Sequence, residues 1–215
     1  MLGMIADAHA TAPATTLQIS ARPFVRAWLI CMALLVFAMV IVGGATRLTD
    51  SGLSITEWLP LLGAIPPLNE ADWMVAFEKY RQIPEYQLVN KGMSLEAFKF
   101  IYWWEWAHRF LGRFIGIAFF VPFVWLLATK RVEARMVPHL ALLFILGGLQ
   151  GALGWYMVSS GLVDRVDVSQ YRLAAHLALA VAIFAYLMWA ALCVEPRGMS
   201  WAGRGVQGAI LVCIL

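Results

Sequence analysis

Four long stretches of apolar residues, separated by short polar segments and one long one, dominate the chain. The first covers Ala27–Thr46, the second begins near Tyr102 and ends before Lys130, and the last two cover about Val137–Ser159 and Leu173–Val194. A helix needs about 20 apolar residues to cross the hydrocarbon core of a bilayer. Membrane strands would alternate apolar and polar positions, which these stretches do not. The pattern predicts an all-α polytopic membrane protein built on a four-helix transmembrane bundle.

The two ends of the chain depart from this pattern. Residues 1–21 are rich in Ala and Thr without periodicity, which predicts a loose N-terminal tail ahead of the four-helix unit at 22–195. A further apolar run starts at Val206 and stops at Leu215. Since so short a run cannot span a bilayer as a helix, we expect 196–215 to be a linker and the start of a fifth, truncated span.

Charge is scarce and unevenly placed. Of the 215 residues, 62% are apolar and 13% are Asp, Glu, Lys or Arg, about half the charged share of a soluble domain. The net charge of +3 gives no nucleic-acid signature. The short link Lys130–Met136 is densely basic, as cytoplasmic loops are. We therefore expect a cytoplasmic N-terminus, with the long loop 47–100 on the outer side.

The long loop 47–100 carries signals for short amphipathic helices. Asn69 is a good N-cap residue, with acidic residues in the turn that follows. One face of that helix would carry three aromatic residues, Trp73, Phe77 and Tyr80. Ser94 is placed to cap another helix, which leads into the second span. We expect the loop to form a lid on the outer membrane surface.

Ionisable residues at helical spacing mark the start of the second span. Glu105 lies three residues before His108 and four before Arg109, and Arg113 lies four further on. Charged groups inside a span are costly and normally face the protein interior. Either arginine alone would fit snorkelling to lipid headgroups. Four ionisable residues within nine positions instead predict a polar functional site.

The fourth span contains one ionisable residue, His176, with Arg172 four residues earlier. Because the second and fourth spans start on the same side, His108 and His176 lie at similar depths, each roughly one turn inside its span. Two imidazoles facing one another across a bundle suit axial ligation of haem iron. Arg109, Arg113 and Arg172 would then pair with haem propionates. The alternative is a hydrogen-bonded pair of core histidines.

The third span offers a smooth face. Gly147, Gly151 and Gly154 recur at helical spacing, which suits close packing of either a neighbouring helix or a flat ring. Gln150 is a candidate polar contact on the same helix. His139, at the other end of this span, is interpreted as non-functional.

Four segments carry a resemblance to a known family. They are GGATRLTDSGLSITEW (43–58), FIYWWEWAHRFLGR (100–113), LQGALGWYMVSSGL (149–162) and VSQYRLAAHL (168–177). Together they closely resemble the haem A synthase family, in its α-proteobacterial and mitochondrial branch. The resemblance covers about 22–195.

The resemblance implies an oxidoreductase that converts the C8 methyl group of haem O to a formyl group, giving haem A for cytochrome c oxidase. It places the family's E-x-x-H-R motif on Glu105, His108 and Arg109, with Glu105 catalytic, and its second histidine on His176. It further implies that the two histidines are axial ligands of the substrate haem. Family members usually have eight spans in two similar halves, the second of which binds haem b. On that pattern this chain is the N-terminal, substrate-haem half, in the bacterial inner membrane with its site near the outer face.

The expected partners are haem O, haem O synthase, cytochrome c oxidase assembly factors and membrane lipid, while the electron donor and a homo-oligomeric state stay open. Two other functions also stay open: a bis-His b-type cytochrome that carries electrons, and a non-catalytic haem-handling assembly protein. Glu105 discriminates against the carrier, since an electron carrier needs no carboxylate inside the membrane.

Overall fold

The computed structural model describes residues 14–59, 62–163 and 166–194, and the regular structure in these ranges is helical. Four helices are long: α1 (Thr16–Leu48), α4 (Leu95–Ala128), α5 (Val137–Ser159) and α6 (Gln170–Cys193). Two are short, α2 (Glu70–Tyr80) and α3 (Pro84–Leu88), and Leu62–Ala64 and Ala134–Met136 form 3-10 turns. All four long helices are long and apolar enough to cross a membrane. The predicted class, an all-α polytopic membrane protein, is confirmed.

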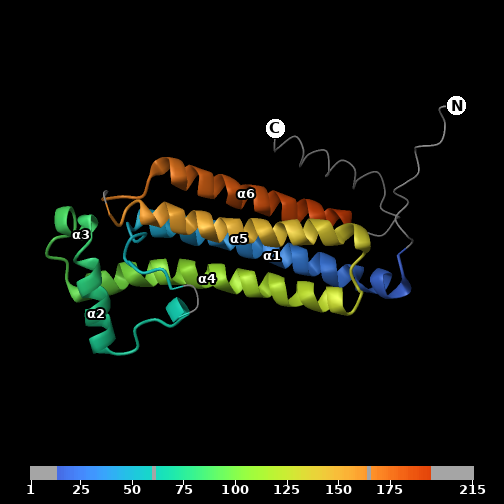
Figure 1. Cartoon of the computed structure of the whole chain (residues 1–215), viewed down its shortest axis with the longest axis horizontal. Helices are drawn as coiled ribbons and strands as arrows, with labels where there is room; N and C mark the ends of the chain where they lie inside the picture. The colour runs from blue at the N-terminus through green and yellow to red at the C-terminus, as the bar shows by residue number, and fades with distance from the viewer. Residues whose placement is uncertain (1–13, 60–61, 164–165, 195–215) are drawn as a thin grey trace.

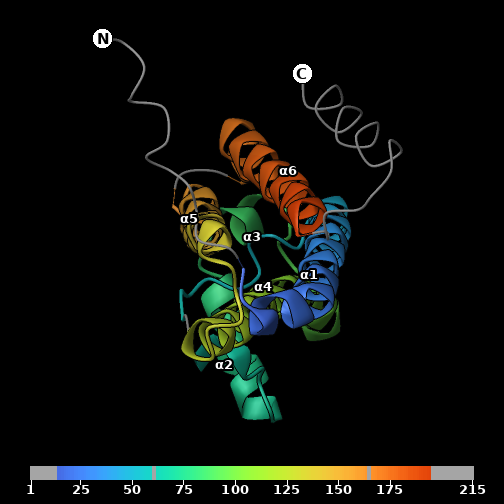
Figure 2. The ribbon, with the colours of Figure 1, turned by 90° about the vertical axis from the view of Figure 1, so that its right-hand side faces the viewer.

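The long helices lie side by side as a bundle (Figure 1). Helix α1 packs against both α4 and α6, and α5 packs against α6 and, less extensively, against α4. Seen end on, the four form a ring in which α4 lies opposite α6 (Figure 2). Residues on α4 and α6 that point inward therefore face one another across the bundle.

Helix α1 starts earlier than the sequence pattern predicted, at Thr16 instead of Ala27. The backbone N–H of Gln18 donates to Thr15 Oγ1 at 3.3 Å, and the backbone N–H of Thr15 donates to Gln18 Oε1 at 2.9 Å. This reciprocal capping satisfies two backbone donors at the helix start. The expectation of a loose tail over 1–21 is therefore wrong for residues 16–21, which are helical. The expected fifth span lies outside the described residues.

The other long helices follow the prediction more closely. Helix α5 has the predicted bounds, and α6 begins three residues earlier than expected, at Gln170 instead of Leu173. Ser94 Oγ accepts a hydrogen bond from the N–H of Ala97 at 3.2 Å, as predicted. The helix it caps is continuous with the second span, so α4 runs 34 residues without a break.

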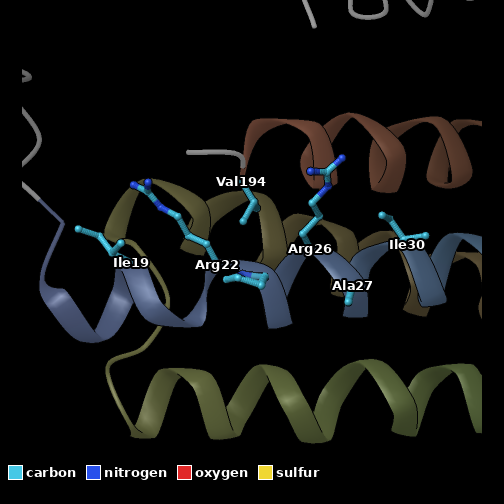
Figure 3. A pocket seen from close by; sticks show the side chains of 7 residues that line it. Ile19, Arg22, Arg26, Ala27, Ile30 and Val194 are labelled. Carbon is cyan, nitrogen blue, oxygen red and sulfur yellow. The ribbon is translucent and has the colours of Figure 1, made fainter. Parts of the chain in front are cut away.

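At one end of the bundle, the link between α4 and α5 is joined to α1 by ion pairs. Arg22 Nε lies 2.6 Å from Glu133 Oε1, and Arg135 Nε lies 2.9 Å from Glu133 Oε2. Burial alone would raise the pKa of Glu133, but the two arginines hold it below its usual range. A cavity of about 390 Å³ opens nearby, lined by Ile19, Arg22, Pro23, Arg26, Ala27, Ile30 and Val194 (Figure 3). It lies at the opposite end of the bundle from the polar turns at the start of α4.

The other end of the bundle is covered by the cap, which we define as residues 49–59 and 62–93 and which contains α2 and α3 (Figure 1). Asn69 Oδ1 accepts from the N–H of Asp72 at 2.9 Å, which confirms the predicted helix cap. The predicted aromatic face is buried against Phe98 and Tyr102 of α4; its members are Trp73, Phe77 and Tyr80. The cap therefore has an aromatic core of its own, continuous with the start of α4.

Glu85 of α3 is buried in the cap at 6% exposure. Tyr80 donates a hydrogen bond from its hydroxyl to Glu85 Oε2 at 3.3 Å. Burial raises the pKa of Glu85 from 4.5 to about 7, and the negative charges of Glu105 and Asp50 add to the rise, while the bond from Tyr80 opposes it.

Cap stability is expected to fall between about pH 4.5 and pH 7, because the folded protein keeps the Glu85 proton through this range while the unfolded chain releases it. The difference between the two pKa values of Glu85 corresponds to about 3 kcal/mol of folding free energy. This stabilisation is fully present below about pH 4.5 and is lost above about pH 7. In Glu85→Gln the thermal unfolding midpoint should change far less between pH 5 and pH 8. Glu78→Gln, an exposed change on α2, should behave like the parent, and an equal pH dependence in all three proteins would contradict the prediction.

Candidate functional site

The Glu105 side chain lies about three turns into α4, is only 2% exposed, and is held by four hydrogen-bond donors. Arg109 donates to Oε1 from Nε at 2.9 Å and from Nη2 at 2.6 Å. The hydroxyl of Ser54 and the backbone N–H of Ile55 both donate to Oε2, each at 2.7 Å. A carboxylate offers about four lone-pair sites, so these four donors fill them. The arrangement stabilises a negative charge at a fixed place beneath the cap.

Arg109 and Arg113 also bind the backbone that leaves α1. Arg109 donates to the carbonyls of Ile55 and Glu57 at 2.8 and 3.1 Å, and Arg113 donates to the carbonyl of Leu59 at 2.9 Å. We call residues 54–59 the strap. The two arginines are therefore partly committed to holding the strap on α4, a role that the sequence pattern did not suggest.

His108 lies one turn further along α4, half-buried, and its ring is directed toward α1. A Cβ atom at Gly43 of α1 would lie only 3.2 Å from His108 Nε2. The imidazole therefore approaches the α1 backbone more closely than a larger side chain at 43 would permit. Gly43 opens the first of the four sequence segments described above, but its contact was not predicted.

His176 is held on the opposite side of the bundle by α5. A Cβ atom at Gly154 would lie 3.1 Å from His176 Cε1. Gln150 Nε2 lies 3.2 Å from His176 Nε2 and donates to the His176 carbonyl at 3.0 Å. Within 14–59, 62–163 and 166–194, His176 Nδ1 is buried without a hydrogen-bond partner, as is Gln150 Oε1. The predicted polar contact of Gln150 is thus with the second histidine.

His108 and His176 belong to the two helices that lie opposite one another in the ring (Figure 2). At Gly147 and Gly151, no atom of the described residues would lie within 4 Å of an added Cβ, so this part of the glycine face is open and not packed on a helix. The orphaned imidazole nitrogen and the open glycine face fit a flat ligand with a metal at its centre, as haem is.

The described residues offer few ligands for a bare metal ion. Among the described residues, no group of three or more His, Cys, Asp and Glu side chains comes together. A bare ion in a protein site usually needs three or four such ligands, whereas haem iron needs only axial ones. If the His176 ring turned so that one of its nitrogens faced a metal, Gln150 Nε2 would still donate to the His176 carbonyl.

Arg172 has a different attachment from the other two predicted arginines. It donates to the carbonyl of Tyr156 at 2.7 Å, and its guanidinium carbon lies 3.8 Å from the centre of the Tyr156 ring. This contact ties the start of α6 to the end of α5. The side chains of Arg109 and Arg113 therefore both contact the strap, whereas the side chain of Arg172 contacts α5. Propionate binding by the three stays a prediction.

His139 lies toward the other end of α5. Its Nδ1 is 2.7 Å from the hydroxyl of Tyr186, and its ring packs edge-on against Trp189 at 5.0 Å. This pair joins α5 to α6 and is separate from the Glu105 site. His139 therefore serves as an internal comparison for the two histidines near the cap.

Comparison with known proteins places this architecture in a family. Residues 26–215 match the profile of the family described as cytochrome oxidase assembly protein. The chain is 68% identical over 165 residues to Heme A synthase of Parvibaculum lavamentivorans, covering 77% of this chain and 48% of that relative. It is 60% identical over 200 residues to Heme A synthase of Rhodospirillum centenum, covering 87% and 54%, respectively.

A third relative, Heme A synthase of Mesorhizobium japonicum, is 55% identical over 186 residues, which cover 86% of this chain and 51% of that protein. The chain thus spans about half the length of the curated relatives it matches. No solved structure matches it. The match to the family extends over most of the sequence, including both histidines and Glu105, and the chain belongs to the cytochrome oxidase assembly protein family.

Proposed function

We propose that this chain is the substrate-haem half of a haem A synthase, which oxidises the C8 methyl group of haem O to the formyl group of haem A. The observation that carries the proposal is the buried Glu105 carboxylate, fixed by four donors one helical turn from His108. A site that only carried electrons would need no such fixed charge. Support also comes from the relatives, which are named for this activity.

In this proposal each residue has a distinct task. His108 and His176 hold the haem from opposite helices, and the open face at Gly147 and Gly151 leaves room for its ring. The haem supplies the methyl carbon that is oxidised. Conversion of a methyl to a formyl group removes four electrons and four protons and adds one oxygen atom from water, so it requires an electron acceptor outside this half. Glu105 supplies a preorganised negative charge, which would stabilise positive charge that develops as the carbon loses electrons to that acceptor. Arg109, Arg113 and Arg172 are proposed to meet the propionates.

The proposed setting is the bacterial inner membrane, with a cytoplasmic N-terminus and the cap on the outer side. The basic link between α4 and α5 supports this orientation, because cytoplasmic loops carry an excess of Lys and Arg. We further propose that haem b binds in the second half present in the longer relatives. The proposed partners are haem O synthase and cytochrome c oxidase assembly factors.

A second candidate function is a bis-His cytochrome or a haem-handling assembly protein. This alternative is favoured by the four hydrogen bonds that Glu105 accepts, because they also hold the strap on α4. In that case Glu105 would be structural and the histidine pair would hold a haem that is not altered.

The test is to express the full-length protein, with its second half, in cells that make haem O but no haem A. Haems are then extracted and separated by chromatography. Haem A is expected only when the protein is present. Bound haem without haem A would overturn the proposed function and leave the carrier and the haem-handling protein to be separated by reversible reduction of the bound haem.

A further inference from the structure

We propose that Ser54 is a positioning residue for Glu105, which it orients from the strap without touching the substrate. The inference rests on the proposed function and extends it to a residue outside the E-x-x-H-R motif. Ser54 comes from the segment after α1, 51 positions before Glu105, and is 2% exposed.

The Ser54 hydroxyl has one proton and two acceptors within reach. Glu105 Oε2 lies 2.7 Å from Oγ, whereas the carbonyl of Ile101 lies 3.4 Å away. The shorter distance and the negative charge both direct the proton to Glu105. The N–H of Ile55 approaches the same oxygen at 2.7 Å, so two adjacent strap residues bind one carboxylate atom.

Helix α4 alone does not fix this carboxylate. Its contribution is Arg109, whose two donors both reach Oε1. The terminal torsion angle of a glutamate side chain takes a broad range of values, so bonds to Oε1 alone would leave the position of Oε2 poorly defined. Ser54 and Ile55 remove that freedom, and the orientation of the charge is therefore set by the strap.

The strap is itself held in register on α4. The carbonyls bound by Arg109 and Arg113 belong to alternate residues, at positions 55, 57 and 59. Arg109 holds the first two of these carbonyls, and Arg113, about one helical turn further along α4, holds the third, so the strap is fixed along the helix axis. Ser54 therefore meets Glu105 at a position that three further hydrogen bonds define.

A purely structural role would give a different result from positioning. The nearby Ser51 is fully buried in the same loop, but it bonds to Thr49 and not to Glu105. Ser51→Ala thus matches Ser54→Ala in chemistry, burial and location. Ser54→Thr keeps the hydroxyl and should restore what Ser54→Ala removes.

The experiment compares the three variants in the full-length protein. Ser54→Ala is expected to lower kcat about 10-fold. This is a smaller loss than the roughly 100-fold that follows a 1 Å misplacement of a reacting group. KM for haem O and the absorption spectrum of the bound haem should stay as in the parent. Ser51→Ala should leave kcat unchanged, and Ser54→Thr should recover most of it. Equal kcat in Ser54→Ala and Ser51→Ala would overturn the proposal, as would a joint loss of haem and activity in Ser54→Ala.

A second readout separates this proposal from the proposed function. The infrared carboxylate band of Glu105, identified by its absence in Glu105→Gln, should shift in Ser54→Ala and not in Ser51→Ala. The shift is expected even if the protein forms no haem A, because it reports the hydrogen bond itself. An unshifted band in a folded, haem-binding Ser54→Ala protein would show that Ser54 does not orient Glu105.

Discussion

Glutamine in place of Glu105 is expected to lower the conversion of haem O to haem A by about 100-fold or more, while haem remains bound. The amide has nearly the size of the carboxylate but carries no negative charge. In either orientation of the amide, its NH₂ group would face other donors and lose their hydrogen bonds. These donors are Arg109 at the Oε1 position, or Ser54 and Ile55 at the Oε2 position. The His108 ring is directed toward Gly43 of α1, so haem ligation by His108 should persist.

The measurement for Glu105→Gln is chromatography of haems extracted from cells that supply haem O to the full-length protein. Glu96→Gln is the matched control, since Glu96 lies on the same helix but is exposed and pairs with Lys99. Parent levels of haem A in Glu105→Gln would reduce Glu105 to a structural partner of Arg109. The electron-carrier function would then be the better description of the histidine pair.

Alanine in place of either His108 or His176 is expected to remove the absorption spectrum of a bis-His haem from this half and to lower its haem content at least about 10-fold. If the two imidazoles hold the haem iron as proposed, a single remaining imidazole would leave the iron one ligand short. His139→Ala provides the control, because His139 bonds to Tyr186 at a separate place on α5. Absorption spectra and haem-to-protein ratios of the purified proteins give the answer.

Two outcomes would contradict the ligand assignment. In one, His176→Ala keeps a parent-like spectrum, which would leave the imidazole as a core group satisfied by Gln150. In the other, His139→Ala loses as much haem as the other two variants, which would point to a general effect of removing an intramembrane histidine. A full-length protein with haem b in its second half would need difference spectra to isolate the first half.

The spans were predictable because their signal is local. Continuous apolar runs bounded by polar residues predict α5 with its observed bounds, and N-cap residues predict the starts of α2 and α4. The start of α1 was missed because residues 1–21 are rich in Ala and Thr without periodicity. The helix nevertheless begins at Thr16, where Thr15 and Gln18 cap it, and Arg22 pairs with Glu133, a contact between residues 111 positions apart.

The part of the site that lies on α4 was predictable because its signal is also local. Helical spacing alone places Glu105 beside Arg109 and one turn from His108. Ser54 and Gly43 reach the site only through tertiary packing, so nothing in their own neighbourhood indicated a contact. The contact of Arg172 with the Tyr156 carbonyl is likewise tertiary and was not predicted, while its binding of a propionate stays a prediction.

The alternating contacts of the strap determine where this protein tolerates changes of length. One residue inserted between Ser54 and Leu59 would displace either Ser54 from Glu105 or some of the carbonyls at 55, 57 and 59 from the two arginines, because these groups are held at fixed positions along α4. An insertion between Ala64 and Asn69, beyond the strap and before α2, would disturb none of these bonds. The loop between α1 and α4 thus combines a segment of fixed length, residues 54–59, with a segment between Ala64 and Asn69 whose length is free to vary.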